Sequence, residues 1–143
     1  MFSLKNTNKK LCIKSSKSFI LFNIKGYQFK ENIGFPDEQD GVYIFTEHTN
    51  PTFNDTTTNI RFYHKMLYCG KTIDLRERFS SHHRKDDLEK HTNLYIAVAY
   101  CDNEKEITQL ENDLLEKYDF PYNDETIGNN TGTEESIIEV VNL

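Results

Sequence analysis

The sequence predicts an α/β domain, because segments typical of strands alternate with segments of helical periodicity. Two apolar residues lie four apart after Asp74, and apolar residues recur at spacings of three and four from Asp102 or Asn103 to about Tyr118, which indicates two amphipathic helices. A chain of 143 residues suits one domain with a real core. Short runs rich in apolar and aromatic residues indicate the central strands, over residues 41–45, 61–69 and 94–100.

The second of these strands leads through a glycine turn into the first helix. Gly70 is expected to release the backbone at the turn. Asp74 can cap the helix, and Glu77 three residues later completes a capping box. Leu75 and Phe79 are four residues apart, so we expect them to share the face that packs on the core.

Four polar side chains around this turn are expected to edge one cleft. Arg78 and His82 are four residues apart, so on a helix they share a face beside the apolar one. Tyr68 lies just before the turn and Lys71 just after it. A tyrosine, a lysine, an arginine and a histidine that converge in this way suit an anionic ligand.

The second helix carries a carboxylate, Glu111, within its apolar stripe. A charge on a core-facing stripe costs free energy unless it meets a cation, a hydrogen-bond donor or a metal ion. The helix is expected to end at Phe120, because Pro121 disfavours helical backbone in the residue before it. Asn123 follows this stop. The stripe itself consists of Ile107, Leu110, Leu114 and Tyr118.

The charge is segregated along the chain, whose formal net charge is -6. Residues 1–30 contain seven lysines and no acidic residue, whereas the remaining residues carry 10 basic and 23 acidic side chains, a net charge of -13. The basic segment is either an arm that contacts phosphates or a solvated tail that keeps the protein soluble. Residues 19–24 are predicted as a strand that pairs with residues 27–29 in a hairpin.

Composition also bears on the compartment of the protein. We find no signal peptide and no apolar run long enough for a membrane span. The three cysteines, Cys12, Cys69 and Cys101, have no metal-ligand spacing, so we expect reduced thiols in a cytoplasmic protein.

Several short motifs together resemble the GIY-YIG nuclease family over about residues 41–123. Two departures are visible. Cys69 stands where isoleucine or valine is usual, and a polar loop over residues 48–59 makes the gap between the two tyrosine motifs long. The motifs are Gly41-Val42-Tyr43, Tyr68-Cys69-Gly70, Arg78 with His82, Glu111, and Asn123.

The resemblance implies a metal-dependent endonuclease that acts on DNA, with a mainly antiparallel, three-stranded central sheet flanked by helices. Glu111 would hold one Mg²⁺ or Mn²⁺, and Arg78 would bind the phosphate as its charge builds. Tyr43 or Tyr68 would orient or deprotonate the water. Since tyrosine has a pKa of about 10, a cation such as Lys71 or the hydrated metal must lower it. His82 would bond to a tyrosine or shuttle its proton, and by family analogy Asn123 buttresses Glu111 and the loop around the site.

The chain is predicted to consist of three parts. They are a basic N-terminal extension over residues 1–40, the nuclease-like domain over 41–123, and a linker with a short apolar segment over 124–143. The run over 137–141 is expected to be an edge strand or a docking segment for a second copy or a protein partner. The rival hypothesis is therefore a catalytically silent scaffold of the same fold. The acidic body favours this rival, and the intact set of motif residues argues against it.

Overall fold

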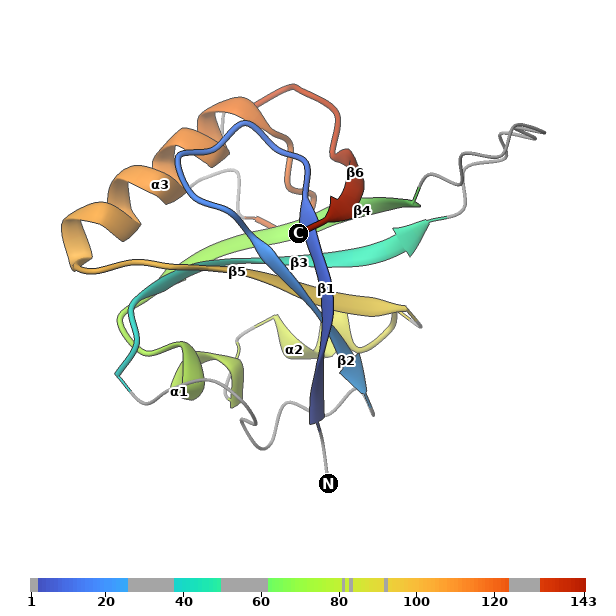
Figure 1. The fold of residues 1–143 in the computed structure, drawn as a ribbon, viewed down its shortest axis with the longest axis horizontal. Helices are drawn as coiled ribbons and strands as arrows, with labels where there is room; N and C mark the ends of the chain where they lie inside the picture. Colours follow the sequence, from blue (N-terminus) through green and yellow to red (C-terminus); the bar gives the residue numbers. More distant parts are fainter. Residues whose placement is uncertain are drawn as a thin grey trace.

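The structure is a computed structural model, drawn in Figure 1. It describes residues 3–25, 38–49, 62–80, 82, 84–91, 93–123 and 132–143. Its elements are β1 (Ser3–Leu11), β2 (Ile20–Lys25), β3 (Gly41–Thr49), β4 (Phe62–Thr72), α1 (Leu75–Ser80), α2 (Lys85–Leu88), β5 (Leu94–Tyr100), α3 (Glu104–Lys117) and β6 (Ile137–Asn142).

The strands form one closed, antiparallel ring in the order β1-β2-β5-β3-β4-β6. The predicted central strands are confirmed as β3, β4 and β5, with β3 in the middle. The prediction of three strands is wrong, because the described part of the chain has six. β3 and β4 each extend beyond their apolar stretch, since pairing with a neighbour holds polar residues such as Glu47 and Lys65 in register.

One of the two interpretations of the N-terminal segment was a solvated tail. The structure shows a folded strand there instead. Residues Ser3–Leu11 form β1, which pairs with β2 and with β6. The register of β1 on β2 shifts between Asn6 and Lys10, and Asn8 has a positive φ of 56° within that shift. An irregularity of this kind disrupts the alternation of apolar and polar residues, so the strand has no clear sequence pattern. The predicted hairpin partner over residues 27–29 lies outside the described residues.

The C-terminal run is confirmed as a strand, but it is not a free edge. Residues 137–140 of β6 pair with β4, and residues 140–142 pair with β1. These two pairings close the ring. Main-chain docking of a partner on these paired residues would require that pairing to open. The division into parts over 1–40, 41–123 and 124–143 stays a prediction, although strands from all three share this sheet.

The segment before β6 is tied to the end of α3. The Gly132 N–H donates to the Leu115 carbonyl (2.8 Å), and the Glu134 N–H donates to the Lys117 carbonyl (3.0 Å). These bonds satisfy carbonyls that have no partner within the helix. A Cβ at residue 132 would lie 2.2 Å from the Tyr118 carbonyl oxygen, so this close approach requires glycine.

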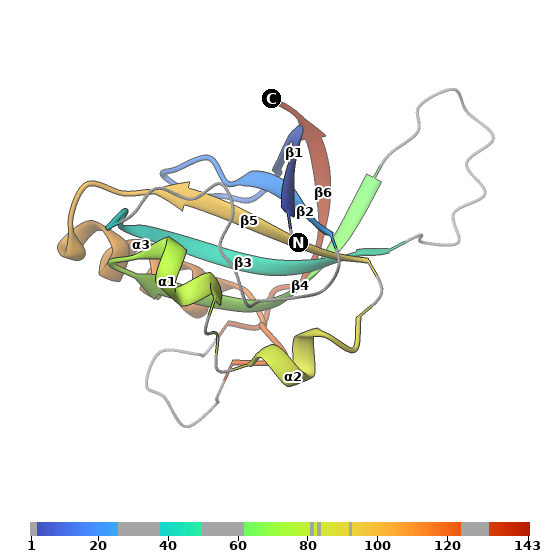
Figure 2. The ribbon, with the colours of Figure 1, turned by 90° about the horizontal axis from the view of Figure 1, so that it is seen from below.

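Two apolar clusters cover the two faces of the central strands. Figure 1 shows α3 on one side of these strands and α1 and α2 on the other, and Figure 2 shows β5, β3 and β4 running side by side. The predicted charged connection over 85–90 contains α2, whose Leu88 is fully buried on the α1 side. Among the described residues, no helix could span a membrane. The α1-side cluster includes Tyr43, Phe45, Tyr68, Leu75 and Phe79, and the other includes Val42, Ile44, Cys69, Leu110 and Leu114.

Candidate active site

Gly70 lies inside β4 rather than at the turn that the sequence predicts. β4 continues to Thr72, and Gly70 is paired directly with Tyr43 on β3. A Cβ on residue 70 would lie 2.4 Å from the Tyr43 hydroxyl oxygen. Glycine is therefore needed here because the tyrosine ring crosses the backbone, and the two tyrosine motifs are in contact at this point.

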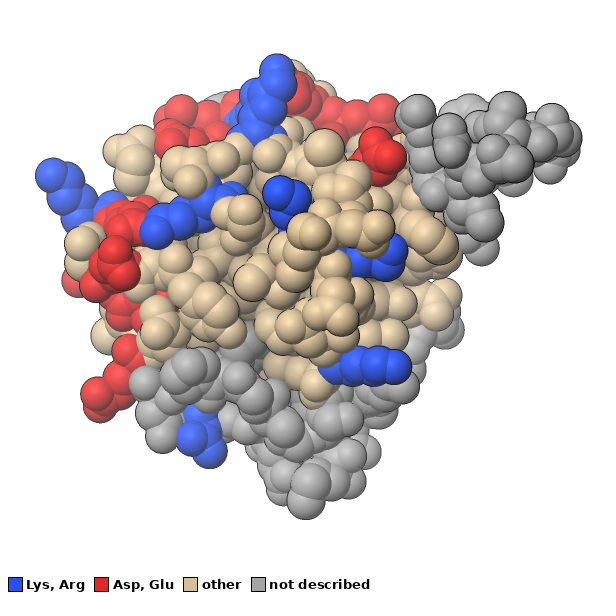
Figure 3. Space-filling model, in the orientation of Figure 1, with Lys and Arg blue, Asp and Glu red and all other residues tan. Residues whose placement is uncertain are grey.

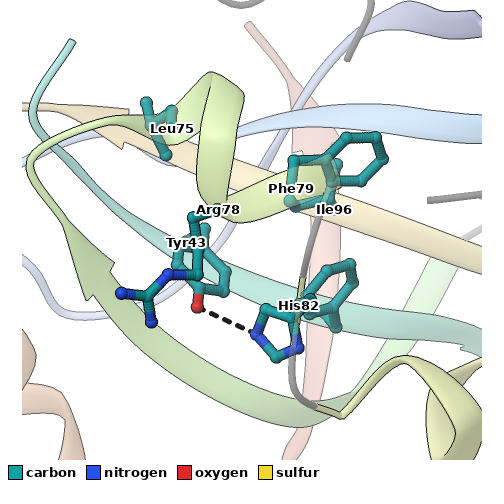
Figure 4. A pocket seen from close by; sticks show the side chains of 7 residues that line it. Tyr43, Leu75, Arg78, Phe79, His82 and Ile96 are labelled. Atoms are coloured by element: carbon teal, nitrogen blue, oxygen red, sulfur yellow. Dashed lines mark hydrogen bonds between the residues drawn. The ribbon is translucent and has the colours of Figure 1, made fainter. Parts of the chain in front are cut away.

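The first turn of α1 holds Arg78 beside the tyrosines. The predicted cap is confirmed, since the Asp74 carboxylate accepts a hydrogen bond from the Glu77 N–H (3.2 Å). The Asp74 N–H donates to the Thr72 hydroxyl (3.0 Å), which extends the cap toward β4. Leu75 and Phe79 are buried as predicted. Arg78 lies beside Tyr43 on the next face of the helix (Figure 4), and its positive charge lowers the pKa of the Tyr43 hydroxyl.

His82 reaches the site by a route that differs from the prediction. α1 ends at Ser80, so His82 lies beyond the helix and does not share a helical face with Arg78. Its Nε2 nevertheless lies 2.9 Å from the Tyr43 hydroxyl (Figure 4), and its ring makes an edge contact with the ring of Tyr68. The convergence expected of Arg78 and His82 therefore exists, and tertiary contacts create it.

The hydrogen bonds of His82 fix where its proton lies. The Arg84 N–H donates to Nδ1 (3.0 Å), so Nδ1 must carry a lone pair. A neutral imidazole then has its proton on Nε2, and this N–H donates to the Tyr43 oxygen. The hydroxyl proton of Tyr43 is consequently free to be donated toward Tyr68, whose ring stacks with that of Tyr43.

Burial raises the pKa of both tyrosines, against the expectation that a neighbouring cation lowers it. Burial, with the negative charge of Glu111, raises the pKa of Tyr68 to about 12. Burial raises the pKa of Tyr43 well above its usual range. The cation that lowers both pKa values is Arg78, whereas the sequence analysis named Lys71 or the hydrated metal. Both hydroxyls are therefore protonated at neutral pH until further positive charge arrives.

Glu111 lies half-buried on α3 and faces the same charges. Burial raises the pKa of its carboxyl group, while the charges of Lys71 and Arg78 lower it. The described residues contain no group of three or more His, Cys, Asp or Glu side chains that could hold a metal ion. One carboxylate with open coordination positions suits Mg²⁺, which retains several waters, so the residues present fit a singly anchored Mg²⁺ or Mn²⁺.

Asn123 and Lys71 contact the surroundings of the site. The Asn123 side chain accepts a hydrogen bond from the Cys69 N–H and donates to the Cys69 carbonyl, both at 2.8 Å. Asn123 thus holds the β4 backbone between Tyr68 and Gly70, whereas the prediction placed it against Glu111. The Lys71 ammonium donates to the Thr108 hydroxyl on α3 (3.1 Å), which ties β4 to the helix that carries Glu111.

A narrow, largely apolar hollow that is too tight for a water molecule lies beneath these groups (Figure 4). Of the two tyrosines, Tyr68 is 8% exposed and Tyr43 is 2% exposed. The hollow is lined by Tyr43, Phe45, Leu75, Arg78, Phe79, His82 and Ile96.

The sequence profile of the GIY-YIG catalytic domain matches residues 39–123, more than half of the chain. The chain belongs to the GIY-YIG family. Nucleases of this family act on DNA, and most use a divalent metal ion. Curated proteins and solved structures provide no match to the chain.

The departure from the GIY-YIG pattern at Cys69 has a simple structural basis. The side chain is 1% exposed and packs in the cluster on the α3 side of the sheet, where an apolar residue is required. Burial raises the pKa of the thiol well above its usual range, so it stays protonated. It acts there as a small apolar side chain.

Three contacts of this GIY-YIG site were missed in the sequence. Thr72 and Thr108 contribute hydroxyl groups, and Arg84 contributes a backbone N–H to His82. A backbone donor leaves no trace in the residue type. Thr72 alone had a local signal, because it lies two residues before the helix cap and can close a short turn there.

Proposed function

We propose that this chain is a divalent-metal-dependent endonuclease that hydrolyses phosphodiester bonds in DNA. The observation that carries the proposal is the convergence of Tyr43, Tyr68, Arg78 and His82, with the Glu111 carboxylate close enough to shift the pKa of Tyr68. Hydrolysis of a phosphodiester depends on positioning and on stabilising negative charge, and these residues supply donors, an acceptor and a carboxylate for it.

Tyr68 is the better of the two candidates for the general base. It is the more exposed residue, and its pKa is raised less than that of Tyr43. His82 donates to the Tyr43 oxygen, which leaves the Tyr43 hydroxyl proton free to be donated to Tyr68, and the neighbouring Tyr43 hydroxyl lowers the pKa of Tyr68. A phenolate on Tyr68 would be stabilised by that donor and by the charge of Arg78.

Arg78 has a second task in this proposal. Its positively charged guanidinium presents a planar set of donors that suits the oxygens of a phosphate. The same charge lowers the pKa of Tyr43, Tyr68 and Glu111. Arg78 therefore favours both the ionised base and an ionised carboxylate.

Glu111 would hold the metal ion, which when bound polarises the phosphate and stabilises the leaving oxygen. In its free form Glu111 raises the pKa of Tyr68, because a negative neighbour disfavours the phenolate. Neutralising that charge would remove this effect. Lys71 and Asn123 would act by holding β4 and α3 in place around these groups.

The first prediction tests the activity and the metal ligand together. Purified protein should nick supercoiled plasmid with Mg²⁺ or Mn²⁺ and not with EDTA, and Glu111→Ala should abolish nicking without loss of the fold. Glu116→Gln, an exposed change on the same helix, is the matched control. Wild-type nicking in EDTA, or full activity of the Glu111→Ala protein, would contradict the assignment.

A further inference from the structure

A second row of hydrogen-bonded side chains lies near the site and joins three distant parts of the chain. The His91 ring binds the Glu47 carboxylate through Nδ1 and the Tyr122 hydroxyl through Nε2, the latter at 2.5 Å. None of these three residues belongs to the family motifs quoted in the sequence analysis. Glu47, His91 and Tyr122 are named the clamp below.

The two ends of the clamp are fixed to the strands that carry the tyrosines. Glu47 is part of β3, four residues beyond Tyr43. Tyr122 follows α3, and its N–H donates to the Leu67 carbonyl of β4 (2.9 Å), one residue before Tyr68. His91, in the middle, therefore has a fixed place relative to both strands.

The middle of the clamp is continuous with the residue that binds His82. The His91 N–H donates to the Leu88 carbonyl (3.1 Å), and the Leu88 N–H donates to the Arg84 carbonyl (3.0 Å). Leu88 is fully buried, and the Arg84 guanidinium lies 3.6 Å from the Asp87 carboxylate. Residues 84–91 thus form one hydrogen-bonded unit, with His91 at one end and the donor to His82 at the other.

We propose that the clamp positions His82. By anchoring residues 84–91 to β3 and β4, it holds the Arg84 N–H against His82 Nδ1, and this bond keeps the imidazole proton on Nε2, directed at Tyr43. His91 and Tyr122 are positioning residues in this scheme. The inference rests on the proposed function for its effect on cleavage, but the state of the His82 ring can be measured without cleavage.

The test compares Tyr122→Phe and His91→Gln with Tyr95→Phe. Tyr95 also has a hydroxyl bonded to a side chain, that of Asn23 (3.2 Å), but it packs against the other cluster of the core. Nitrogen NMR of the His82 ring in the wild-type protein should report one tautomer, with an unprotonated Nδ1 and a protonated Nε2. Both clamp variants should shift the two nitrogen signals toward each other, and Tyr95→Phe should leave them unchanged.

Cleavage supplies the second measurement. In both clamp variants kcat should fall by roughly tenfold with KM unchanged, the size expected when a supporting hydrogen bond is lost. An unchanged His82 spectrum in both clamp variants would overturn the inference, as would an equal change in Tyr95→Phe. A wild-type protein that cuts no DNA would refute the proposed function instead, and the ring spectra would still decide the role of the clamp.

Discussion

The Tyr43 oxygen is the meeting point of the candidate site. It accepts from His82, the charge of Arg78 lowers its pKa, and the Tyr43 ring stacks with that of Tyr68. Because these contacts meet at one almost fully buried side chain, the orientation of each residue depends on the others. Changes to single residues here should therefore alter the rate of chemistry more than the affinity for DNA.

The second prediction concerns Arg78. Arg78→Ala should slow cleavage by roughly 10²–10³, the loss typical of removing one donor to a transition state, with little effect on DNA affinity. Arg78→Lys should recover little of this, because a point charge does not replace a planar fork of donors. Single-turnover rates and binding curves on the same DNA separate the two effects, and an Arg78→Ala enzyme with wild-type rates would refute the assignment.

The third prediction follows from the raised pKa of Tyr68, about 12. Below that value the phenolate fraction grows about tenfold for each pH unit, so the cleavage rate should rise with pH between 7 and 9. Tyr68→Phe should abolish cleavage, whereas Tyr43→Phe should lower the rate and keep the pH dependence. Single-turnover pH profiles of the three proteins provide the measurement, and a flat wild-type profile would argue against a tyrosine base.

Among the elements, β1 is the strand that the sequence did not predict and that matters most for the fold. It pairs with two neighbours and, together with β6, closes the ring. Figure 3 shows lysine and arginine side chains over the face formed by β1 and β2, and acidic side chains along the edge at α3. The lysines of this segment are therefore displayed on a folded surface, and Lys17 is paired there with Glu106 (2.6 Å).

The fourth prediction separates the two roles of this segment. Deletion of residues 1–17 should destabilise the fold, because it removes β1, whereas the triple variant of Lys5, Lys10 and Lys14 to Gln should fold normally. Thermal unfolding by circular dichroism distinguishes them. A truncated protein as stable as the wild type would show that the ring does not need β1.

The same triple variant tests whether the lysines attract DNA. Each phosphate contact adds about 0.9 to the slope of log affinity against log salt on duplex DNA, so loss of three contacts should flatten the slope clearly. None of these three lysines is a candidate site residue, so single-turnover cleavage at saturating DNA should not change. An unchanged slope would mean that these lysines only solubilise the protein.

At the scale of the whole molecule, one buried histidine couples stability to pH. His64 is 3% exposed and bonded to the Thr46 hydroxyl, and burial, with a smaller effect of His48, lowers its pKa to about 3. Between pH 6.5 and 3 the unfolded chain binds a proton at this residue and the folded chain does not. The free energy of unfolding therefore falls as the pH falls through this window.

The fifth prediction puts a size on that effect. His64 should contribute a loss of about 1.4 kcal/mol for each pH unit below 6.5. His64→Gln, whose amide can still bond to Thr46, should flatten this dependence. Urea unfolding at pH 7, 6 and 5 supplies the slopes, and equal slopes for the variant and the wild type would refute the coupling.

The sequence alone determined the parts that depend on neighbouring residues. The strands β3, β4 and β5, the Asp74 cap, the Asn103 cap and the buried face of α3 follow from local periodicity and capping chemistry. The motif residues also follow from the sequence, because their types and order are visible there without any contact being known.

The tertiary structure decided everything that depends on residues far apart in the chain. Cys69 and Asn123 are bonded across 54 positions, and Tyr43 and His82 across 39. The place of β1 in the ring, the position of His82 beyond the helix and the need for glycine at residue 70 are of the same kind. Hydrogen bonds between strand edges, and the close approach of a ring to a backbone, use groups that every residue has, so they leave no pattern in the residue types.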